Sequence, residues 1–472
     1  WDMCCGVGNL EVKHSNPRNV FMSTLDQADI DVMKASKTCV AATRFQYDYL
    51  NDDITDDGKI DYSLTNKVPQ ALQQAIKDGK KLLILINPPY AEATNSANAS
   101  ISSRGDETST KEGVSKTRFA ATAMNEYGKA SNELFMQFIV RIAQEIPTAT
   151  LAVFSKLKYI TSPTLDVFRD AWGAKYLSGF AVHSKAFDGL TGNFPIGFLV
   201  WNTDMQTKNK KAITTVNTEV LDKNAQPIGE KIFYSAPEHQ LLTNWIERQK
   251  ANQLEVIPLK NAITPATTSK DLRGTKWADG AIAWLNCPGN DIQQANLTAL
   301  LSSGFSSGRG FFVTDKNLWQ AAIIFSVRRL IKPTWINDRD QFLQPTEPLT
   351  DEFKNDCLIW MLFSGSNLTA SANDLEWNSK KWSIVNHFIP FREDVVGAPD
   401  CFESDFMVQY LQDKKLSSEA KTVLREGKKL WQAYFKHTDN HTVRDELKLN
   451  RPDVGWYQIR KALEARNESD DY

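Results

Sequence analysis

Short apolar runs alternate with amphipathic stretches over the first two hundred residues of the chain. NVFMSTL (19–25), LLILI (82–86) and TATLAVFSKL (148–157) are typical of buried strands. QALQQAIK (70–77) and ELFMQFIVRIAQEI (133–146) instead repeat apolar residues at helical spacing. Strands separated by helices predict an α/β domain with a parallel sheet and right-handed crossovers.

The same alternation continues as far as residue 203. Further strands are expected near 45–49, in KYLSGFAVHS (175–184) and in GNFPIGFLVWNT (192–203), with a helix in TLDVFRDAW (164–172). The polar and basic segment DMQTKNKK (204–211) then indicates a boundary.

One long segment, 91–130, interrupts the pattern directly after NPPY. It is poor in apolar residues and rich in Ser, Thr, Asn and Ala, so it cannot bury a core of its own. We predict a long mobile loop, because loops of this length are usually functional or disordered. A lid over a site and plain disorder are the two interpretations.

The chain has 472 residues, too many for one ordinary core. We predict a first domain at 1–204, a second region at 205–400 that mixes short strands with many aromatic residues, and a helical tail at 401–472. Trp1 is not a Met and already resembles the end of a strand. We therefore expect that an N-terminal piece is missing.

Composition indicates an ordinary globular protein. Hydrophobic residues make up 42% and charged residues 24%, and no apolar run is long enough to span a bilayer. The net charge of −2 argues against a surface that coats nucleic acid throughout, but it permits one basic groove. The six cysteines are scattered, which favours a reducing cytoplasmic compartment.

The first candidate site is the glycine motif in DMCCGVGNLE, which begins at Asp2. Gly6 and Gly8 stand between a strand and an expected helix, where they let backbone approach a ligand and where a helix N-terminus offers free N–H groups. Asp26 ends the next strand, about 20 residues on, where a carboxylate can bind a ribose diol. Asp26 could equally cap the following helix.

A second acidic position follows the third strand. Asp48 and Tyr49 together offer a carboxylate and a ring, which suit the amino group and the face of an adenine. An ordinary turn aspartate is the alternative.

The strand LLILI runs straight into Asn87, Pro88, Pro89 and Tyr90. Proline lacks a backbone donor and fixes φ, so the two prolines end the strand and stiffen the backbone after it. The ends of parallel strands are where α/β sheets bind ligands, which favours a binding role for this motif over a plain rigid turn.

In combination, DMCCGVGNLE, Asp26, Asp48–Tyr49 and NPPY resemble the S-adenosylmethionine-dependent methyltransferases that act on amino groups, above all on adenine N6 in DNA. ELFMQFI, TLAVFSKLKYI and GNFPIGFLVW are similar to that family's remaining core segments. The resemblance covers residues 1–203. It implies a Rossmann-like catalytic domain with S-adenosyl-L-methionine as cofactor, followed by a mixed α+β target-recognition region and the helical tail.

The resemblance assigns a role to each residue of NPPY. The Asn87 side-chain oxygen and the Pro88 carbonyl would hold the two hydrogens of the adenine amino group, with Pro89 stiffening the turn. Tyr90 would stack on a base that has left the duplex. Phe194 is a second stacking candidate, and an ordinary core phenylalanine is its alternative.

Partners and location follow from the same resemblance. It implies double-stranded DNA as substrate, a restriction-modification setting with a possible restriction endonuclease or other subunit, and a bacterial or phage protein in the cytoplasm at the nucleoid. Lys156, Lys158 and Arg309 are candidate DNA contacts, although basic residues more often lie on solvated faces. No metal site is expected, because His437 and His441 lack further ligands at metal spacing.

Two other readings stay open. NPPY also occurs in methyltransferases that modify a protein glutamine amide, and related motifs occur in methyltransferases that modify RNA bases. The large aromatic-rich region after residue 204 argues against a protein substrate, which needs no such region. A non-catalytic DNA-recognition subunit is the third reading, and the intact NPPY motif argues against it.

Overall fold

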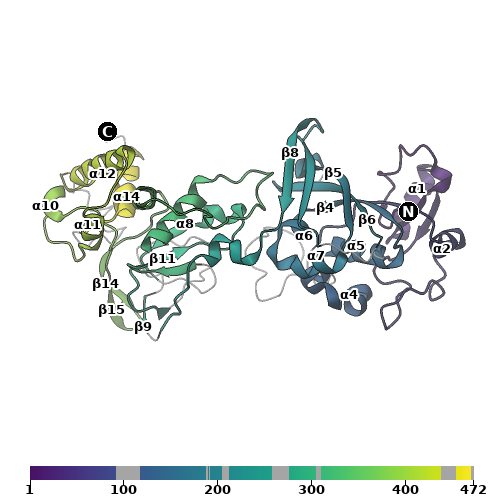
Figure 1. Cartoon of the computed structure of the whole chain (residues 1–472), viewed down its shortest axis with the longest axis horizontal. Coiled ribbons are helices and arrows are strands. Elements are labelled where there is room, and N and C mark those ends of the chain that lie inside the picture. The colour runs from purple at the N-terminus through teal and green to yellow at the C-terminus, as the bar shows by residue number, and fades with distance from the viewer. Residues whose placement is uncertain are drawn as a thin grey trace. The chain divides into compact units, whose positions relative to one another are not determined.

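The structure is a computed structural model that describes residues 1–91, 117–187, 190, 192–204, 212–252, 254–257, 276–303, 310–436 and 453–468. The chain forms two compact units. Unit 1 consists of Trp1–Pro237 and Thr334–Asp340, and unit 2 consists of Glu238–Pro333 and Gln341–Tyr472. Figure 1 labels the elements of both units.

Six strands form the central sheet of unit 1, in the order β3-β4-β6-β5-β7-β8. Their bounds are β3 Leu83–Ile86, β4 Thr150–Lys156, β5 Lys175–His183, β6 Pro195–Asn202, β7 Thr215–Leu221 and β8 Pro227–Tyr234. The predicted parallel sheet is corrected to a mixed one, because β6 runs antiparallel to both β4 and β5. Between β5 and β6 the described residues contain only a 3-10 turn, η5 (Ser184–Ala186), and no crossover helix.

Residues 1–3 connect this sheet to two further strands. These are β1 (Phe21–Thr24) and β2 (Thr43–Gln46), which pair in parallel. The Asp2 N–H donates to the Phe21 carbonyl at 3.0 Å, and the Ser23 N–H donates to the Asp2 carbonyl at 2.9 Å. The Trp1 nitrogen donates to the Leu83 carbonyl in β3 at 2.9 Å, so residues 1–3 link β1 to β3.

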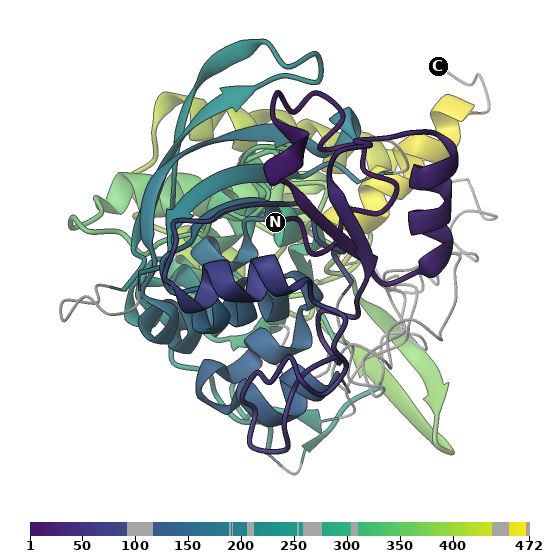
Figure 2. The same ribbon diagram turned by 90° about the vertical axis from the view of Figure 1, so that its right-hand side faces the viewer.

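The helices of unit 1 are α1 Gln27–Ala35, α2 Gln70–Lys77, α4 Arg118–Ala123, α5 Leu134–Glu145, α6 Lys158–Thr161 and α7 Asp166–Trp172, with 3-10 turns η1 Pro17–Asn19, η3 Asn125–Asn132 and η4 Pro163–Leu165. α1 and α2 face the viewer in Figure 2. α4 to α7 lie together on one side of the sheet (Figure 1). α5 is buried over nearly its whole length, and its buried residues include the polar Gln137, Arg141 and Glu145.

Two predicted segments differ in the structure. The residues after the glycines, 6–13, form turns and not a helix, so the expected helix N-terminus is absent there. Within the predicted loop 91–130, α4 and η3 fold and place Phe119 and Tyr127 in the core. Two aromatic anchors thus order a segment whose composition is mostly polar. Residues 92–116 lie outside the described residues, and the lid prediction falls on them.

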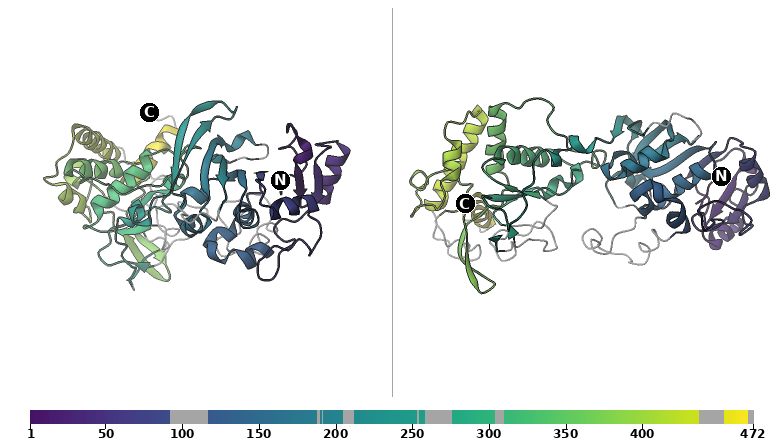
Figure 3. Two further views of the ribbon diagram at one scale, coloured as in Figure 1. Left: turned by 45° about the vertical axis from the view of Figure 1, so that its right-hand side comes forward. Right: turned by 60° about the horizontal axis from the view of Figure 1, so that its bottom comes forward.

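The sheet also continues beyond residue 204, where the first domain was predicted to end. β7 alternates exposed and buried side chains, the pattern of a strand with one face on the core. The teal hairpin of β7 and β8 stands at the edge of the sheet in Figure 3. The functional limits 1–204, 205–400 and 401–472 stay predictions.

Unit 2 combines small antiparallel sheets with helices. Its strands are β9 Leu254–Glu255, β10 Lys276–Trp277, β11 Ala283–Asn286, β12 Ala299–Leu301, β13 Gly310–Val313, β14 Ala372–Trp377 and β15 Lys380–Ile384. Its helices are α8 Leu318–Leu330, α9 Asp351–Leu362, α10 Glu393–Val396, α11 Phe406–Leu411, α12 Ser418–Lys436 and α14 Trp456–Glu468, with 3-10 turns η6 Glu238–Gln240, η7 Leu242–Asn244 and η9 Ile292–Leu297. Mixed structure followed by helices agrees with the sequence pattern.

Candidate functional site

The candidate site lies along one edge of the unit 1 sheet. From residues 1–3 the chain proceeds to β1 and β2 on one side, whereas β3 leads to β4 on the other side. The crevice between residues 1–3 and β3 is therefore a topological switch point, where open α/β sheets bind ligands. Gly6 follows the first of these segments and Asn87 follows β3, so both begin loops at this edge.

A cavity of about 330 Å³ occupies this edge. It is lined by Met3, Cys4, Gly6, Thr24, Leu25, Tyr47, Asp48, Tyr49, Leu50, Asn51, Pro89, Thr117, Leu134 and Phe138. Four of the predicted site residues, Gly6, Asp48, Tyr49 and Pro89, thus line one cavity. Asp2, Gly8 and Asp26 are not among its lining residues.

The two motif glycines serve different purposes in this structure. Gly6 has φ +50°, and a Cβ built on it meets nothing within 4 Å, so it leaves space at the cavity wall. Gly8 has φ +82°, and a Cβ there would lie 2.7 Å from Met22 Cε and 3.1 Å from Met33 Sδ. Gly8 is therefore required for the packing of the loop against β1 and α1, and only Gly6 faces the cavity.

Asp48 is held in place by the turn that it stabilises. Its Oδ1 accepts from the Leu50 N–H at 3.2 Å and its Oδ2 from Asn51 Nδ2 at 2.8 Å. A carboxylate retains further lone pairs after two such bonds, so it can still accept from a ligand. The two readings of Asp48, a turn aspartate and a cavity acceptor, are therefore compatible.

Tyr49 is more deeply buried than a base-stacking residue would be. Its side chain is 2% exposed, and its hydroxyl donates to Glu145 Oε2 at 2.6 Å. Its ring stacks on Phe138, with centroids 5.4 Å apart. Tyr49 lines the cavity, but with so little of its surface exposed it offers a ligand only a small contact area. The predicted contact between its ring and adenine stays a prediction.

Asp2 lies beneath the glycine loop and fixes it. Its Oδ1 accepts from the Cys4 N–H at 2.8 Å, and the side chain is buried. Glu11 is also buried, and within the described part of the chain neither of its carboxyl oxygens has a hydrogen-bond partner of good geometry. Burial raises the pKa of Glu11 to about 9, and the neighbouring Asp2 carboxyl adds to the rise.

The buried Glu11 predicts that stability falls with increasing pH. Its folded-state pKa of about 9 exceeds the ordinary 4.5, so the folded chain keeps a proton that the unfolded chain releases. This contribution to the free energy of unfolding is complete below pH 4.5 and is lost as the pH rises towards 9. Glu11→Gln should flatten the dependence, as measured by urea denaturation from pH 5 to 9.

The exposed Glu126→Gln variant is the control for this measurement, and its pH dependence should match that of the wild type. An unchanged pH dependence in Glu11→Gln would show that Glu11 is not protonated in the folded state.

Asp26 occupies the position before α1 but does not cap it. Its backbone is extended, with φ −94° and ψ 129°, and its side chain makes no capping hydrogen bond. The carboxylate is exposed beside Leu25, which lines the cavity. Asp26 thus occupies the N-cap position of α1, but its side chain does not cap the helix. Its role in binding a ribose stays a prediction.

The NPPY motif forms a loop with internal and external hydrogen bonds. Asn87 and Pro89 are exposed, Pro88 is buried and Tyr90 is half-buried. The Tyr90 hydroxyl donates to Asn87 Oδ1 at 2.7 Å. An amide oxygen has two lone pairs, so Asn87 can accept a second hydrogen from another donor. Burial raises the pKa of Tyr90, so the hydroxyl keeps its proton as a donor.

Phe194 stands at the same edge of the sheet. It precedes β6, in which Ile196 pairs with Lys156 at the end of the antiparallel β4. The Ser184 N–H donates to the Phe194 carbonyl at 3.0 Å, which fixes the backbone, and the ring is half-buried. A side chain at Gly192 would collide with that ring at 2.3 Å. The stacking role of Phe194 stays a prediction.

The predicted DNA contacts have partners inside unit 1 or lie outside the described residues. Lys156 Nζ donates to the Tyr90 carbonyl at 2.8 Å. Lys158 Nζ pairs with Glu133 at 2.6 Å, a carboxylate whose side chain is 2% exposed. Arg309 lies outside the described residues. The position of Lys156 and Lys158 at a strand end agrees with the prediction, but both ammonium groups have partners other than DNA.

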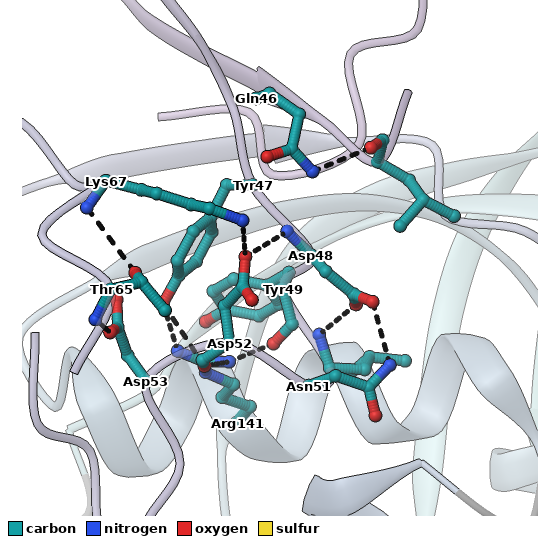
Figure 4. A network of polar contacts seen from close by, with 12 residues as sticks. Gln46, Tyr47, Asp48, Tyr49, Asn51, Asp52, Asp53, Thr65, Lys67 and Arg141 are labelled. Carbon is teal, nitrogen blue, oxygen red and sulfur yellow. Dashed lines mark hydrogen bonds and ion pairs between the residues drawn. The ribbon is translucent and has the colours of Figure 1, made fainter. Parts of the chain in front are cut away.

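Sequence reasoning missed the network that holds Asp48 in place (Figure 4). Arg141 of α5 is fully buried, pairs with Glu145 at 3.2 Å, and donates to the Tyr47 hydroxyl at 2.7 Å and to the Asp52 carbonyl at 3.1 Å. A signal was present, since an arginine stands among apolar residues in ELFMQFIVRIAQEI with a glutamate four positions on.

The described residues contain neither a membrane-spanning helix nor a cluster of metal ligands. No helix there is long and apolar enough to cross a membrane. No group of three or more His, Cys, Asp and Glu side chains gathers there to hold a metal ion. His437 and His441 lie outside that part of the chain.

No protein-family model matches the chain, and no curated protein sequence does. Among solved structures, the chain is similar to the ATP-dependent Type ISP restriction-modification enzyme LlaBIII bound to DNA, at 11% identity and TM-score 0.31, over 61% of this chain and 22% of that one. It is similar to a DrdV–DNA complex at 12% identity and TM-score 0.30, over 61% of this chain and 32% of that one.

A third solved structure is a mutant of DNMT2 from Spodoptera frugiperda, at 12% identity and TM-score 0.23, over 55% of this chain and 62% of that one. The chain thus spans less than two thirds of each of these three chains. Likenesses this weak do not establish a shared activity for this mixed α/β protein.

Proposed function

We propose that the chain is an S-adenosylmethionine-dependent DNA methyltransferase that methylates the N6 amino group of an adenine flipped out of the duplex. One observation carries the proposal: the cavity at the switch point is lined by Gly6, by Asp48 and by Pro89, which stands two residues after Asn87. The proposal assigns this cavity to the cofactor and assigns the acceptor of the target amino group to Asn87, in the same loop as Pro89.

The cavity suits the proposed cofactor. Its volume of about 330 Å³ falls in the range of small-molecule sites, roughly 300–1,000 Å³. Leu50, Leu134 and Phe138 supply apolar walls for a purine ring, and Asp48 supplies an acceptor for its amino group. The open space at Gly6 admits the ligand close to the backbone. In this proposal Asp26, next to the cavity residue Leu25, binds the ribose.

The proposed chemistry depends on positioning. An adenine amino group is a poor nucleophile because its lone pair is delocalised into the ring. The Asn87 side-chain oxygen and the Pro88 carbonyl would accept its two hydrogens and localise the lone pair, which is preorganised electrostatics and needs no general base before attack. S-adenosylmethionine supplies the methyl group, whose bond to sulfur breaks, leaving the electron pair on sulfur, as its bond to N6 forms. N6 then loses a proton to solvent.

The Tyr90 ring would stack on the flipped base. Its hydroxyl donates to Asn87 Oδ1, so the ring and the amide acceptor are held next to each other. Phe194, at the neighbouring end of β6, is the proposed second stacking residue.

Because Gly6 faces open space and Gly8 is tightly packed, alanine substitutions at the two positions should have different effects. Gly6→Ala places a methyl group at the cavity and should weaken S-adenosylmethionine binding, with a stability loss of roughly 1–2 kcal/mol for the left-handed backbone. Gly8→Ala should destabilise the fold further, since the new Cβ collides with Met22, while binding to the folded fraction is less affected. Calorimetric titration and urea denaturation measure the two effects, and the reverse ranking would contradict the assignment of Gly6 to the cavity wall.

We propose further that residues 205–400 recognise the DNA target, that residues 401–472 form a helical tail, and that the protein works in a restriction-modification setting beside a nuclease. An adenine amino group is paired inside the duplex, so the enzyme must extrude its target base.

The proposed function is tested with tritiated S-adenosylmethionine and host-unmodified DNA, followed by digestion to nucleosides. Label in N6-methyladenine is the expected result. Label in protein or RNA but not in DNA would assign the chain to a different substrate class. Cofactor binding without transfer to any substrate would indicate a recognition subunit.

A further inference from the structure

The NPPY loop is held from outside by two hydrogen bonds. Lys156 Nζ donates to the Tyr90 carbonyl at 2.8 Å, and the Leu134 N–H at the start of α5 donates to the Ala91 carbonyl at 3.1 Å. The carbonyls of two consecutive residues, Tyr90 and Ala91, thus accept hydrogen bonds from β4 and from α5, respectively. The prolines stiffen the first half of the loop, and these two donors fix the second half.

Lys156 reaches the loop because of the sheet register. β3 and β4 are parallel, with Ile86 opposite Val153, so β4 extends three residues beyond the last pair to Lys156 while β3 has already turned into NPPY. Lys156 also pairs through its backbone with Ile196 of β6. The lysine therefore projects from the ordered end of a strand, and its ammonium group can hold the loop.

We infer that Lys156 is a positioning residue for the proposed methyl transfer and not a DNA contact. The inference rests on the proposed function. By fixing the Tyr90 carbonyl, Lys156 holds the Tyr90 ring, whose hydroxyl in turn binds Asn87 Oδ1 at 2.7 Å. The chain of contacts runs from the strand to the amide that accepts the target hydrogens.

The positive charge of Lys156 disfavours an electrostatic role for this residue in the methyl transfer. The attacking N6 gains positive charge as the new bond to carbon forms, and a nearby ammonium group opposes that charge. A contribution of Lys156 to the rate must therefore be geometric, through the carbonyl that it binds.

The test compares Lys156→Met, Lys156→Arg and the control Lys175→Met. Methionine keeps most of the length but neither donor nor charge, and arginine retains donors that can reach the Tyr90 carbonyl. Lys175 is exposed at the start of β5, the opposite end of that strand from His183. For Lys156→Met we expect a single-turnover methylation rate at saturating DNA lower by roughly 10- to 100-fold. Its DNA affinity and salt dependence should be unchanged, Lys156→Arg should recover much of the rate, and Lys175→Met should match the wild type.

Two other outcomes would overturn the inference. If Lys156→Met kept the rate at saturating DNA but bound DNA more weakly, with a salt slope smaller by about 1, Lys156 would be a phosphate contact. If rate and affinity were both unchanged, the lysine would have no role in the site.

A readout that does not depend on activity separates this inference from the proposed function. Amide hydrogen exchange at Leu134, whose N–H donates to the Ala91 carbonyl, should accelerate roughly tenfold or more in Lys156→Met and stay at the wild-type rate in Lys175→Met. Unchanged exchange in both variants would contradict the positioning role even if the wild type transferred no methyl group to DNA. A wild type that transfers none, with the expected exchange pattern, would instead refute the DNA substrate alone.

Discussion

Asn87→Ala is expected to lower the single-turnover rate of methyl transfer to DNA by roughly 10²–10³-fold, the usual loss when one preorganised hydrogen-bonding group is removed from an active site. The variant removes the amide oxygen that accepts from Tyr90 at 2.7 Å and that is proposed to accept from adenine N6. Asn87 is exposed, so its truncation should change the free energy of unfolding little. Rapid-quench transfer of tritiated methyl groups measures the rate.

The control for Asn87→Ala is Asn224→Ala, at an exposed turn between β7 and β8, which should keep the wild-type rate. S-adenosylmethionine affinity should be the same in both variants, because Asn87 does not line the cavity. Wild-type methylation by Asn87→Ala would exclude the amide as the acceptor and would overturn the proposed mechanism.

The end of the strand before NPPY was predictable from the local sequence. LLILI ends at Ile86 because two prolines follow, and the structure ends β3 at that residue. QALQQAIK forms α2 over the predicted 70–77. Local signals of this kind need no tertiary contact, and they place Gly6, Asp48 and Pro89 at the ends of neighbouring segments.

The remaining differences depend on contacts between segments far apart in the chain. The turns after Gly6 follow from packing, since Gly8 has to approach Met22 and Met33. α4 and η3 are short, and they fold because Phe119 and Tyr127 reach the core. β7 is different, because TVNTEVL alternates polar and apolar residues, and this local period predicts a strand beyond residue 204.

The partners of Arg141 could not be derived from the sequence, because most of them lie in the segment from Tyr47 to Asp52 and not in α5. Nη1 donates to the carbonyl of Tyr49, Nη2 to the hydroxyl of Tyr47, and Nε to Glu145. Tyr62 adds a further hydroxyl to the Glu145 carboxylate. Figure 4 shows Arg141 beneath the loop that carries Asp48. The loop after β2 is thus fixed by a side chain of α5, and the cavity wall depends on it.

Arg141→Met should lower the free energy of unfolding by about 3–5 kcal/mol, the usual cost of leaving one member of a buried ion pair without its partner. Arg141 is 0% exposed and Glu145 is 9% exposed, so water cannot replace the lost contacts. Urea denaturation measures the loss. The exposed pair of Arg118 and Asp56 provides the control, because Arg118→Met should cost at most about 1 kcal/mol.

The double variant Arg141→Met/Glu145→Met should be less destabilised than the sum of the two single variants, because no charge is left buried without a partner. In both Arg141 variants the affinity for S-adenosylmethionine should fall, since the segment from Tyr47 to Asp52 loses its anchor and Asp48 moves with it. Loss of stability with unchanged cofactor affinity would mean that the turn bonds of Asp48 suffice to hold the cavity wall. If stability and the affinity for S-adenosylmethionine both fell, α5 would position the cavity wall through Arg141, a residue that does not line the cavity.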